Sequence, residues 1–183
     1  MIETSKTNID GCFKVKFDHH HDSRGEFVKT FNSDLFKGTP LEYFNLSEEY
    51  YSSSKKNVLR GLHFQRPPHD HNKFVYCISG EVTDFFLDIR RNSITYGKLC
   101  SVKISSEYNK FNAIFLPKGI AHGFISESEK SVLVYKTDSK YNEKSDDGIN
   151  WKSFINELSI ENPIVSDRDN SFITFDDFIS PFN

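Results

Sequence analysis

Arg60, His63 and Lys73 are polar side chains set in two stretches that otherwise have the pattern of apolar β-strands. Residues 58–65 alternate, so that successive side chains project to opposite faces of a strand. A charged group in an apolar interior costs free energy unless it is paired or has a function there. Histidine also changes charge near neutral pH, which suits it to take up and release protons. These residues predict a polar pocket in a β-barrel, with His63 as a candidate for acid–base chemistry.

Short strands separated by turn residues surround this stretch. Pro67-Pro68 ends the strand at 58–65, because proline cannot continue a sheet ladder. The next predicted pair, 73–78 and 81–89, is joined by Ser79-Gly80. We expect the remaining strands at 12–17, 26–31, 97–104, 112–116, 120–126 and 131–137. Because no long amphipathic pattern is present, the sequence favours an all-β antiparallel sandwich or barrel.

The segments between the predicted strands are polar or irregular. Those expected to be turns or loops are 18–25, 48–56 and 141–151. Short peripheral helices are expected at 32–37, where Ser33 is the candidate cap, and around 175–179.

The histidines at 19–21 and the three cysteines do not show the spacing of a metal site. The histidines at 19–21 are consecutive, and adjacent side chains in a loop rarely converge on one ion, so we interpret them as an exposed loop. Cys12, Cys77 and Cys100 are odd in number and lack a metal-ligand spacing. They are predicted to be reduced, partly buried thiols.

The composition limits the class of protein. The 183 residues suffice for a single domain, 1–183, with a hydrophobic core. The net charge of -3 gives no reason to expect nucleic acid or an anionic membrane as a partner. No apolar run approaches the length of a membrane span, and residues 1–6 lack the apolar core of a signal peptide. We therefore expect a cytoplasmic protein.

Six motifs occur along the chain in a fixed order: Asp22–Phe27, Leu59–Gln65, Asp88–Arg90, Leu116–Phe124, Tyr135–Thr137 and Pro163–Asp169. Together they resemble the dTDP-4-dehydrorhamnose 3,5-epimerase family of cupin-fold sugar-nucleotide enzymes, over nearly the whole chain. The resemblance implies a cupin jelly-roll β-barrel, no metal and no organic cofactor. It also implies a homodimer in which an N-terminal strand crosses to the second copy.

The resemblance implies an epimerase that inverts carbon 3, carbon 5 or both in a nucleoside-diphosphate 4-keto-6-deoxy sugar, in deoxysugar and cell-surface polysaccharide biosynthesis. Inversion removes a proton beside the ketone, forms an enolate and returns a proton to the other face. This chemistry needs a base, an acid on the opposite face and a cation near the oxyanion. By the family match, His63 is the base and Asp169 orients its ring. Tyr135 matches the proton donor and Lys73 the enolate-stabilising cation.

Further residues match the family's contacts with the sugar nucleotide. Arg24 and Arg60 match residues that face the pyrophosphate and the sugar, and a guanidinium suits phosphate oxygens. Phe27 and Tyr141 match aromatic residues near the substrate. His122 matches a pocket histidine to which the sequence assigns no role.

Four positions depart from the family pattern and are expected near the nucleotide and sugar. Lys29 and Lys144 stand where the family commonly has glutamate, and Glu48 and Tyr50 where it has glutamine and asparagine. The catalytic residues are kept while the substrate contacts change. We therefore predict a nucleotide pocket that tolerates or prefers something other than the usual thymidine-linked substrate.

Three alternatives remain open. One is a related enzyme that epimerises a single carbon or acts as a 3,4-ketoisomerase. Another is a metal-binding cupin, suggested by the pair His69 and His71 and by the motif that ends at His122. However, the pair His69 and His71 falls in a proline-flanked turn, and no suitably spaced glutamate follows it. The third is an inactive sugar-nucleotide binder, which the retention of His63 and Tyr135 argues against.

Overall fold

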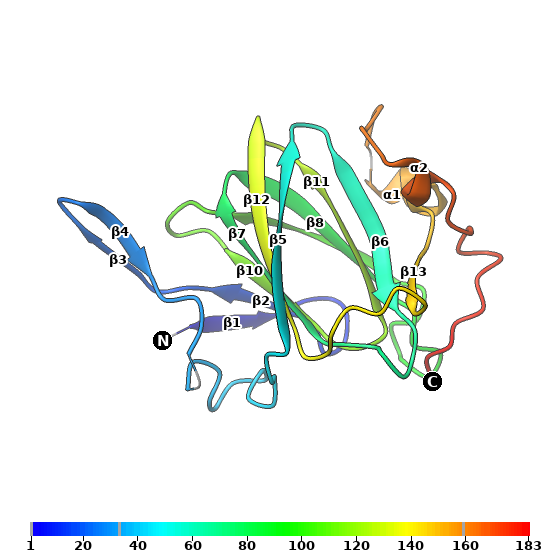
Figure 1. Ribbon diagram of the computed structural model, residues 1–183, viewed down its shortest axis with the longest axis horizontal. Helices are drawn as coiled ribbons and strands as arrows, with labels where there is room; N and C mark the ends of the chain where they lie inside the picture. The colour runs from blue at the N-terminus through cyan, green and yellow to red at the C-terminus, as the bar shows by residue number, and fades with distance from the viewer. Residues whose placement is uncertain (1, 33, 159) are drawn as a thin grey trace.

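Two antiparallel sheets face each other and form a barrel (Figure 1). The computed structural model describes residues 2–32, 34–158 and 160–183. The first sheet has the order β1-β2-β10-β7-β12-β5, with bounds Glu3–Lys6, Phe13–Lys16, Ala113–Leu116, Lys73–Ser79, Lys130–Thr137 and Glu48–Lys55. The second has the order β13-β6-β11-β8-β9, with bounds Asp146–Gly148, Leu59–Gln65, Ile120–Ser126, Glu81–Asp88 and Leu99–Ser105. The prediction of an all-β antiparallel fold is confirmed.

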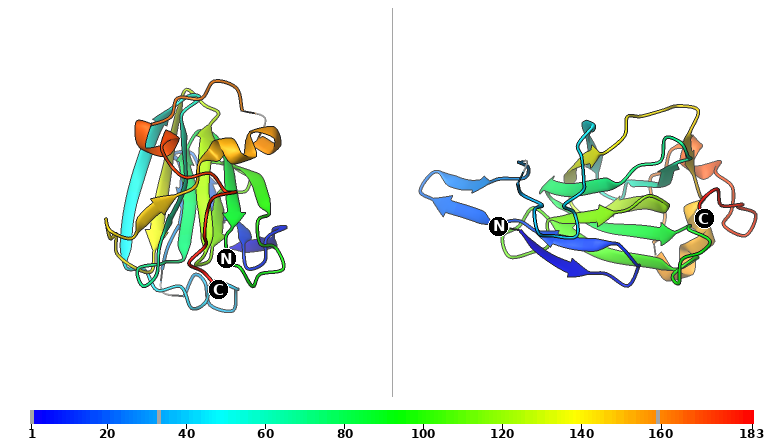
Figure 2. Two further views of the ribbon diagram at one scale, coloured as in Figure 1. Left: turned by 90° about the vertical axis from the view of Figure 1, so that its right-hand side faces the viewer. Right: turned by 90° about the horizontal axis from the view of Figure 1, so that it is seen from below.

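The central strands of the second sheet, β6, β11 and β8, are buried on both faces along most of their length. On β8, Phe86 belongs to the core between the sheets together with Leu133 of β12. The neighbouring Phe85 and Leu87 pack on the other face, in a cluster that includes Trp151 of the C-terminal segment. That segment, orange to red in Figure 2, covers the outside of the sheet. A strand covered on both sides loses the alternation of a half-exposed strand.

Strand β5 occupies residues that the sequence predicts as a polar loop. It pairs with β12 along its whole length. The side chains of Tyr50 and Ser52 line a cavity inside the barrel, whereas Tyr51 is exposed on the outer face. Because the inward residues are polar, the hydrophobic alternation that marks a strand is missing. The predicted loop at 141–151 likewise contains the short strand β13.

A separate hairpin, β3 (His19–Asp22) and β4 (Gly25–Val28), projects away from the barrel (Figures 1 and 2). The turn predicted at 18–25 is confined to residues 23–24, and the histidines at 19–21 lie in a strand, not in the predicted loop, although His20 and His21 are exposed as predicted. Both segments read as polar because most hairpin residues are exposed, so no apolar periodicity develops.

The helices lie elsewhere than predicted. They are η1 (Trp151–Phe154), α1 (Ile155–Leu158) and α2 (Asp167–Asn170). Turns occupy residues 34–43 in place of the predicted helix at 32–37, whose candidate cap Ser33 lies outside the described residues, and 175–177 are also a turn. In the part of the chain that the structure describes, no helix is long and apolar enough to cross a membrane. The three cysteines are free thiols, two of them buried, as predicted.

Candidate active site

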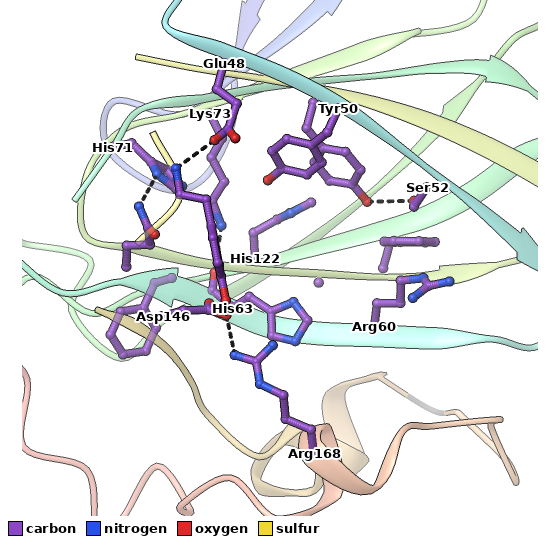
Figure 3. Close-up of a pocket in the computed structure, with 16 residues that line it drawn as sticks. Glu48, Tyr50, Ser52, Arg60, His63, His71, Lys73, His122, Asp146 and Arg168 are labelled. Atoms are coloured by element: carbon purple, nitrogen blue, oxygen red, sulfur yellow. Dashed lines mark hydrogen bonds and ion pairs between the residues drawn. The ribbon is translucent and has the colours of Figure 1, made fainter. Parts of the chain in front are cut away.

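A cavity of about 430 Å³ lies between the two sheets and opens to solvent (Figure 3). Its volume falls in the usual range for small-molecule sites. The first sheet contributes five lining side chains: Glu48, Tyr50, Ser52, Lys73 and Tyr135. The second sheet and its flanking segments contribute Arg60, His63, His122, Tyr141, Asp146 and Arg168. Eight residues that the sequence predicts to lie at the site therefore meet in one cavity, although they come from separate strands and loops.

His63 is held by Asp169, which lies behind it on α2. The His63 Nε2 atom is 2.8 Å from Asp169 Oδ1, and Asp169 Oδ2 accepts a hydrogen bond of 3.0 Å from the Gly61 amide. Burial alone would raise the pKa of Asp169, but the hydrogen bonds from His63 and Gly61 outweigh it and lower that pKa. The ionised carboxylate accepts the Nε2 proton, so in the neutral tautomer of His63 the basic nitrogen is Nδ1.

Gly61 permits the close approach of β6 and β11 beside this pair. Its φ is +121°, and a Cβ atom there would lie 2.5 Å from the Cα of Gly123. A side chain at this position would displace the backbone amide that binds Asp169.

Tyr135 faces the cavity from the opposite sheet. Its hydroxyl shares a hydrogen bond of 3.1 Å with Ser52, and its ring stacks on Tyr50 at a centroid distance of 4.9 Å. Burial raises the pKa of Tyr135 above its usual range, so the phenol keeps its proton at neutral pH. Tyr135 therefore places a buried, protonated phenol on the side of the cavity opposite to His63.

Lys73 is the buried cation of the cavity. Its ammonium group donates a hydrogen bond of 2.9 Å to the backbone carbonyl of His63, which ties it to the strand of the histidine. Burial lowers the pKa of Lys73 to about 8, against the opposing influence of Asp146 and Asp84. Lys73 is still charged at neutral pH, where it can stabilise an oxyanion.

His122 forms a second histidine–carboxylate pair beside the first. Its Nε2 atom is 2.7 Å from Asp84 Oδ2, and β11 places His122 directly across the ladder from His63. Asp84 is fully buried, which raises the pKa of its carboxyl group. Its Oδ1 atom has no hydrogen-bond partner among the described residues.

Sequence reasoning missed several residues that line the cavity: Ser52, Gln65, His71, Asp146 and Arg168. Placing 48–56 in a strand would have found Ser52, because it shares a face with Glu48 and Tyr50. Arg168 adjoins the matched Asp169 and donates a hydrogen bond of 2.6 Å to Asp146. Burial, with nearby Lys73, lowers the pKa of His71 to about 3, so this ring is neutral.

Arg24, Phe27 and Lys29 are predicted substrate contacts that the structure does not bring to the cavity. None of the three is among the described residues that line it. Arg24 lies at the tip of the hairpin, where it pairs with Asp22, and Phe27 is 62% exposed. The hairpin leaves the barrel, which separates these residues from the cavity of their own chain (Figure 1). Lys144, predicted near the substrate, is also exposed and outside the described lining.

The chain is similar to known proteins over most of its length. The sequence model of the dTDP-4-dehydrorhamnose 3,5-epimerase family matches residues 6–177. An enzyme of that name from Escherichia coli is 39% identical over 182 residues, which cover 95% of each chain.

Solved structures with the same fold include a dTDP-6-deoxy-D-glucose-3,5-epimerase of Legionella pneumophila in complex with dTDP-4-keto-L-rhamnose. It has a TM-score of 0.90 and 27% identity, with 100% of this chain and 99% of that chain covered. A 3'-monoepimerase of Streptomyces bikiniensis in complex with dTDP-quinovose has a TM-score of 0.79 and 25% identity, with coverage of 92% and 85%. These similarities confirm the predicted cupin jelly-roll fold.

Proposed function

Because the chain belongs to the dTDP-4-dehydrorhamnose 3,5-epimerase family, we propose that it inverts carbons 3 and 5 of a dTDP-linked 4-keto-6-deoxy sugar. The proposal places this isomerase in deoxysugar biosynthesis in the cytoplasm, supplying cell-surface polysaccharide such as the O-antigen of lipopolysaccharide. One observation carries it: His63 and Tyr135 enter the same cavity from opposite sheets. Inversion needs proton removal and proton return on opposite faces of the sugar ring, which this arrangement provides.

In the proposed reaction His63 Nδ1 removes the proton next to the ketone. The ring becomes an imidazolium, and the ionised Asp169 stabilises it through the 2.8 Å hydrogen bond. The electrons move into the carbonyl, and Lys73 lies near enough to His63 to stabilise the oxyanion as it forms. Tyr135 then gives its proton to the opposite face of the carbon, with Ser52 hydrogen-bonded to its hydroxyl. These groups supply the charge and the protons, so the reaction needs no metal and no organic cofactor.

Substrate contacts are assigned to the remaining polar side chains at the cavity. Arg60 and Arg168 offer guanidinium groups to the diphosphate. Glu48 accepts a hydrogen bond of 2.7 Å from the backbone of Tyr141, so these two residues border the opening together. His122 is assigned to a contact with the sugar.

The four positions that differ from the family pattern concern how the substrate is recognised, and they leave the proposed reaction unchanged. Of the four residues, Glu48 and Tyr50 line the cavity, and Lys29 and Lys144 are outside the described lining. The names of the relatives support a dTDP-linked substrate. The expectation of a different nucleotide preference stays a prediction.

We also propose that a second copy of the chain supplies Arg24, Phe27 and Lys29. A two-stranded hairpin without further strands is only marginally stable alone. Strand β5 ends its sheet beside the cavity and has one ladder partner, β12, among the described strands, so its other edge is free to pair. Exposed Tyr51 and Ile78 on this sheet give the apolar contact that a homodimer would bury.

Of the alternative functions, a monoepimerase has support from a solved structure, whereas a metal-binding cupin meets an obstacle in the arrangement of the ligand atoms. Similarity to the 3'-monoepimerase keeps open the inversion of a single carbon. For a metal-binding cupin, three ligand atoms must converge. Among the residues that the structure describes, neither His71 nor His122 belongs to such a group.

The test is to incubate the protein with dTDP-4-keto-6-deoxyglucose in deuterated water and to locate deuterium in the product. Deuterium at carbons 3 and 5, with both centres inverted, is the expected result. Deuterium at one carbon would identify a monoepimerase. Its absence from both carbons, with substrate bound, would contradict the proposed function.

A further inference from the structure

The projecting hairpin carries two histidines and a glutamate on one face. His19 and His21 alternate on β3 and therefore point the same way, and their rings stack with an interplanar angle of 15°. Glu26 is paired with His21 across the hairpin. One ligand atom from each of the three residues lies within 4.8 Å of the others. The sequence interpretation of an exposed loop fails here because a strand, unlike a loop, brings alternate side chains together.

Asn112 fixes which nitrogen of His19 carries the proton. The Asn112 Nδ2 atom donates to the Ser105 carbonyl at 2.9 Å, and its Oδ1 accepts from the Phe17 amide at 3.1 Å. The same Oδ1 lies 3.4 Å from His19 Nε2. Since this oxygen can only accept, Nε2 carries a proton, and in the neutral tautomer Nδ1 holds the lone pair.

The His19 Nδ1 atom faces a carboxylate across a gap that takes either a proton or a metal ion. His19 Nδ1 is 2.8 Å from Glu26 Oε2. Two acceptors at this distance repel unless a proton or a metal ion is shared. A histidine that ligates with one nitrogen while the other donates to a carbonyl oxygen is the usual arrangement at metal sites.

Of the three candidate ligands, His19 is packed against its neighbours, whereas His21 and Glu26 are open to solvent. The His19 side chain is 4% exposed, and Tyr108 packs edge-on against His19 and His21, with a centroid distance of 4.8 Å to His21. Glu26 and His21 are exposed, so an ion can enter and the carboxylate can adjust. His19 is thus held in place while the other two ligands can close on an ion.

We propose that His19 Nδ1, His21 and Glu26 bind one divalent transition-metal ion, with water in the remaining position. Two imidazoles and a carboxylate suit Zn²⁺ in tetrahedral coordination and also bind Ni²⁺ or Cu²⁺. The site lies outside the catalytic cavity, and the inference does not depend on the proposed reaction. A bound ion cross-links β3 to β4 and stabilises the hairpin that carries Arg24 and Phe27.

The test is calorimetric titration of Zn²⁺ into untagged, full-length protein that has been freed of metal with a chelator. One ion per chain is expected, with a micromolar or tighter dissociation constant and a rise in the unfolding temperature. Loss of a residue that only hydrogen-bonds to a metal ligand typically weakens metal binding by about tenfold or more. Loss of a ligand itself should weaken Zn²⁺ binding at least as much. His21→Ala and Glu26→Gln should both show this loss.

His20→Ala is the matched control, because His20 lies on the same strand but faces away from the cluster. It should bind Zn²⁺ as the unmodified protein does. His21 is exposed, so its replacement should leave the fold intact, and circular dichroism checks this. Equal affinity and stoichiometry in His21→Ala and the unmodified protein would overturn the proposal, as would an absence of Zn²⁺ binding at millimolar concentration.

Discussion

His63 and His122 lie directly opposite each other on β6 and β11, and each ring is hydrogen-bonded to its own buried carboxylate. The two pairs differ in electrostatics. The pKa of Asp169 is lowered because hydrogen bonds outweigh its burial, whereas burial raises the pKa of Asp84. His63 is 30% exposed to the cavity and His122 only 4%. The more accessible ring therefore has the firmly ionised partner, which suits His63 to be the base.

Tyr135→Phe separates proton removal from proton return. The variant keeps the stacked ring but lacks the proton that the opposite face requires. Inverted product should fall by about 10²–10³-fold, while exchange with solvent on the His63 side continues. Product inversion and deuterium incorporation are measured in the same reaction. Tyr43→Phe, at an exposed loop position, is the control, and normal product formation by Tyr135→Phe would exclude the tyrosine as donor.

The lowered pKa of Lys73 predicts that activity is lost at alkaline pH. Its pKa is lowered to about 8, so kcat/KM should fall as pH rises through that value and the ammonium charge is lost. The effect of this group on folding has the opposite direction. From about 8 to the ordinary value of 10.5 the unfolded chain binds more protons at Lys73, so stability rises with pH.

The pH profile of Lys73→Gln checks this assignment. The variant should be slow at all pH values and lack the limb near pH 8, while Lys110→Gln, at an exposed position, keeps it. A Lys73→Gln profile with the same alkaline limb would assign that limb to another group.

Glu48→Gln tests the altered substrate contacts. Glutamine can still accept the hydrogen bond from Tyr141 but removes a negative charge beside a diphosphate substrate. A like charge at a partly exposed contact is worth about 1 kcal/mol, so KM for the dTDP-linked sugar should fall about fivefold. Comparison of dTDP- and UDP-linked substrates shows whether the preference shifts. An unchanged KM and preference would remove Glu48 from recognition.

Mixing two inactive variants tests the shared site. In a dimer of Arg24→Ala with His63→Ala, one cavity has both an intact His63 and an intact Arg24 from the second chain. Random reassembly after denaturation should then restore about a quarter of the wild-type activity. Light scattering establishes the dimer independently. If each chain used its own hairpin, the mixture would stay as inactive as its components.

The sequence predicted the residues that meet in the cavity better than the strands that carry them. His63, Lys73 and Tyr135 were found because polar groups in apolar strands stand out and match a family pattern. Strand β5 was missed because Tyr50 and Ser52 face a cavity, so the strand lacks an apolar side. Arg168 and His71 were missed because their place at the cavity depends on how distant segments pack. No local periodicity encodes that packing.

Solvent exchange catalysed by His63→Ala tests the central claim most directly. The variant and the unmodified protein are incubated with the 4-keto sugar nucleotide in deuterated water, and deuterium at carbons 3 and 5 is followed by mass spectrometry and NMR. Binding of dTDP to the variant confirms that its cavity is intact. With the base removed, exchange at both carbons and formation of inverted product should be lost. Exchange at carbon 3 at a near wild-type rate would contradict the assignment of His63 as the base and, with it, the proposed mechanism.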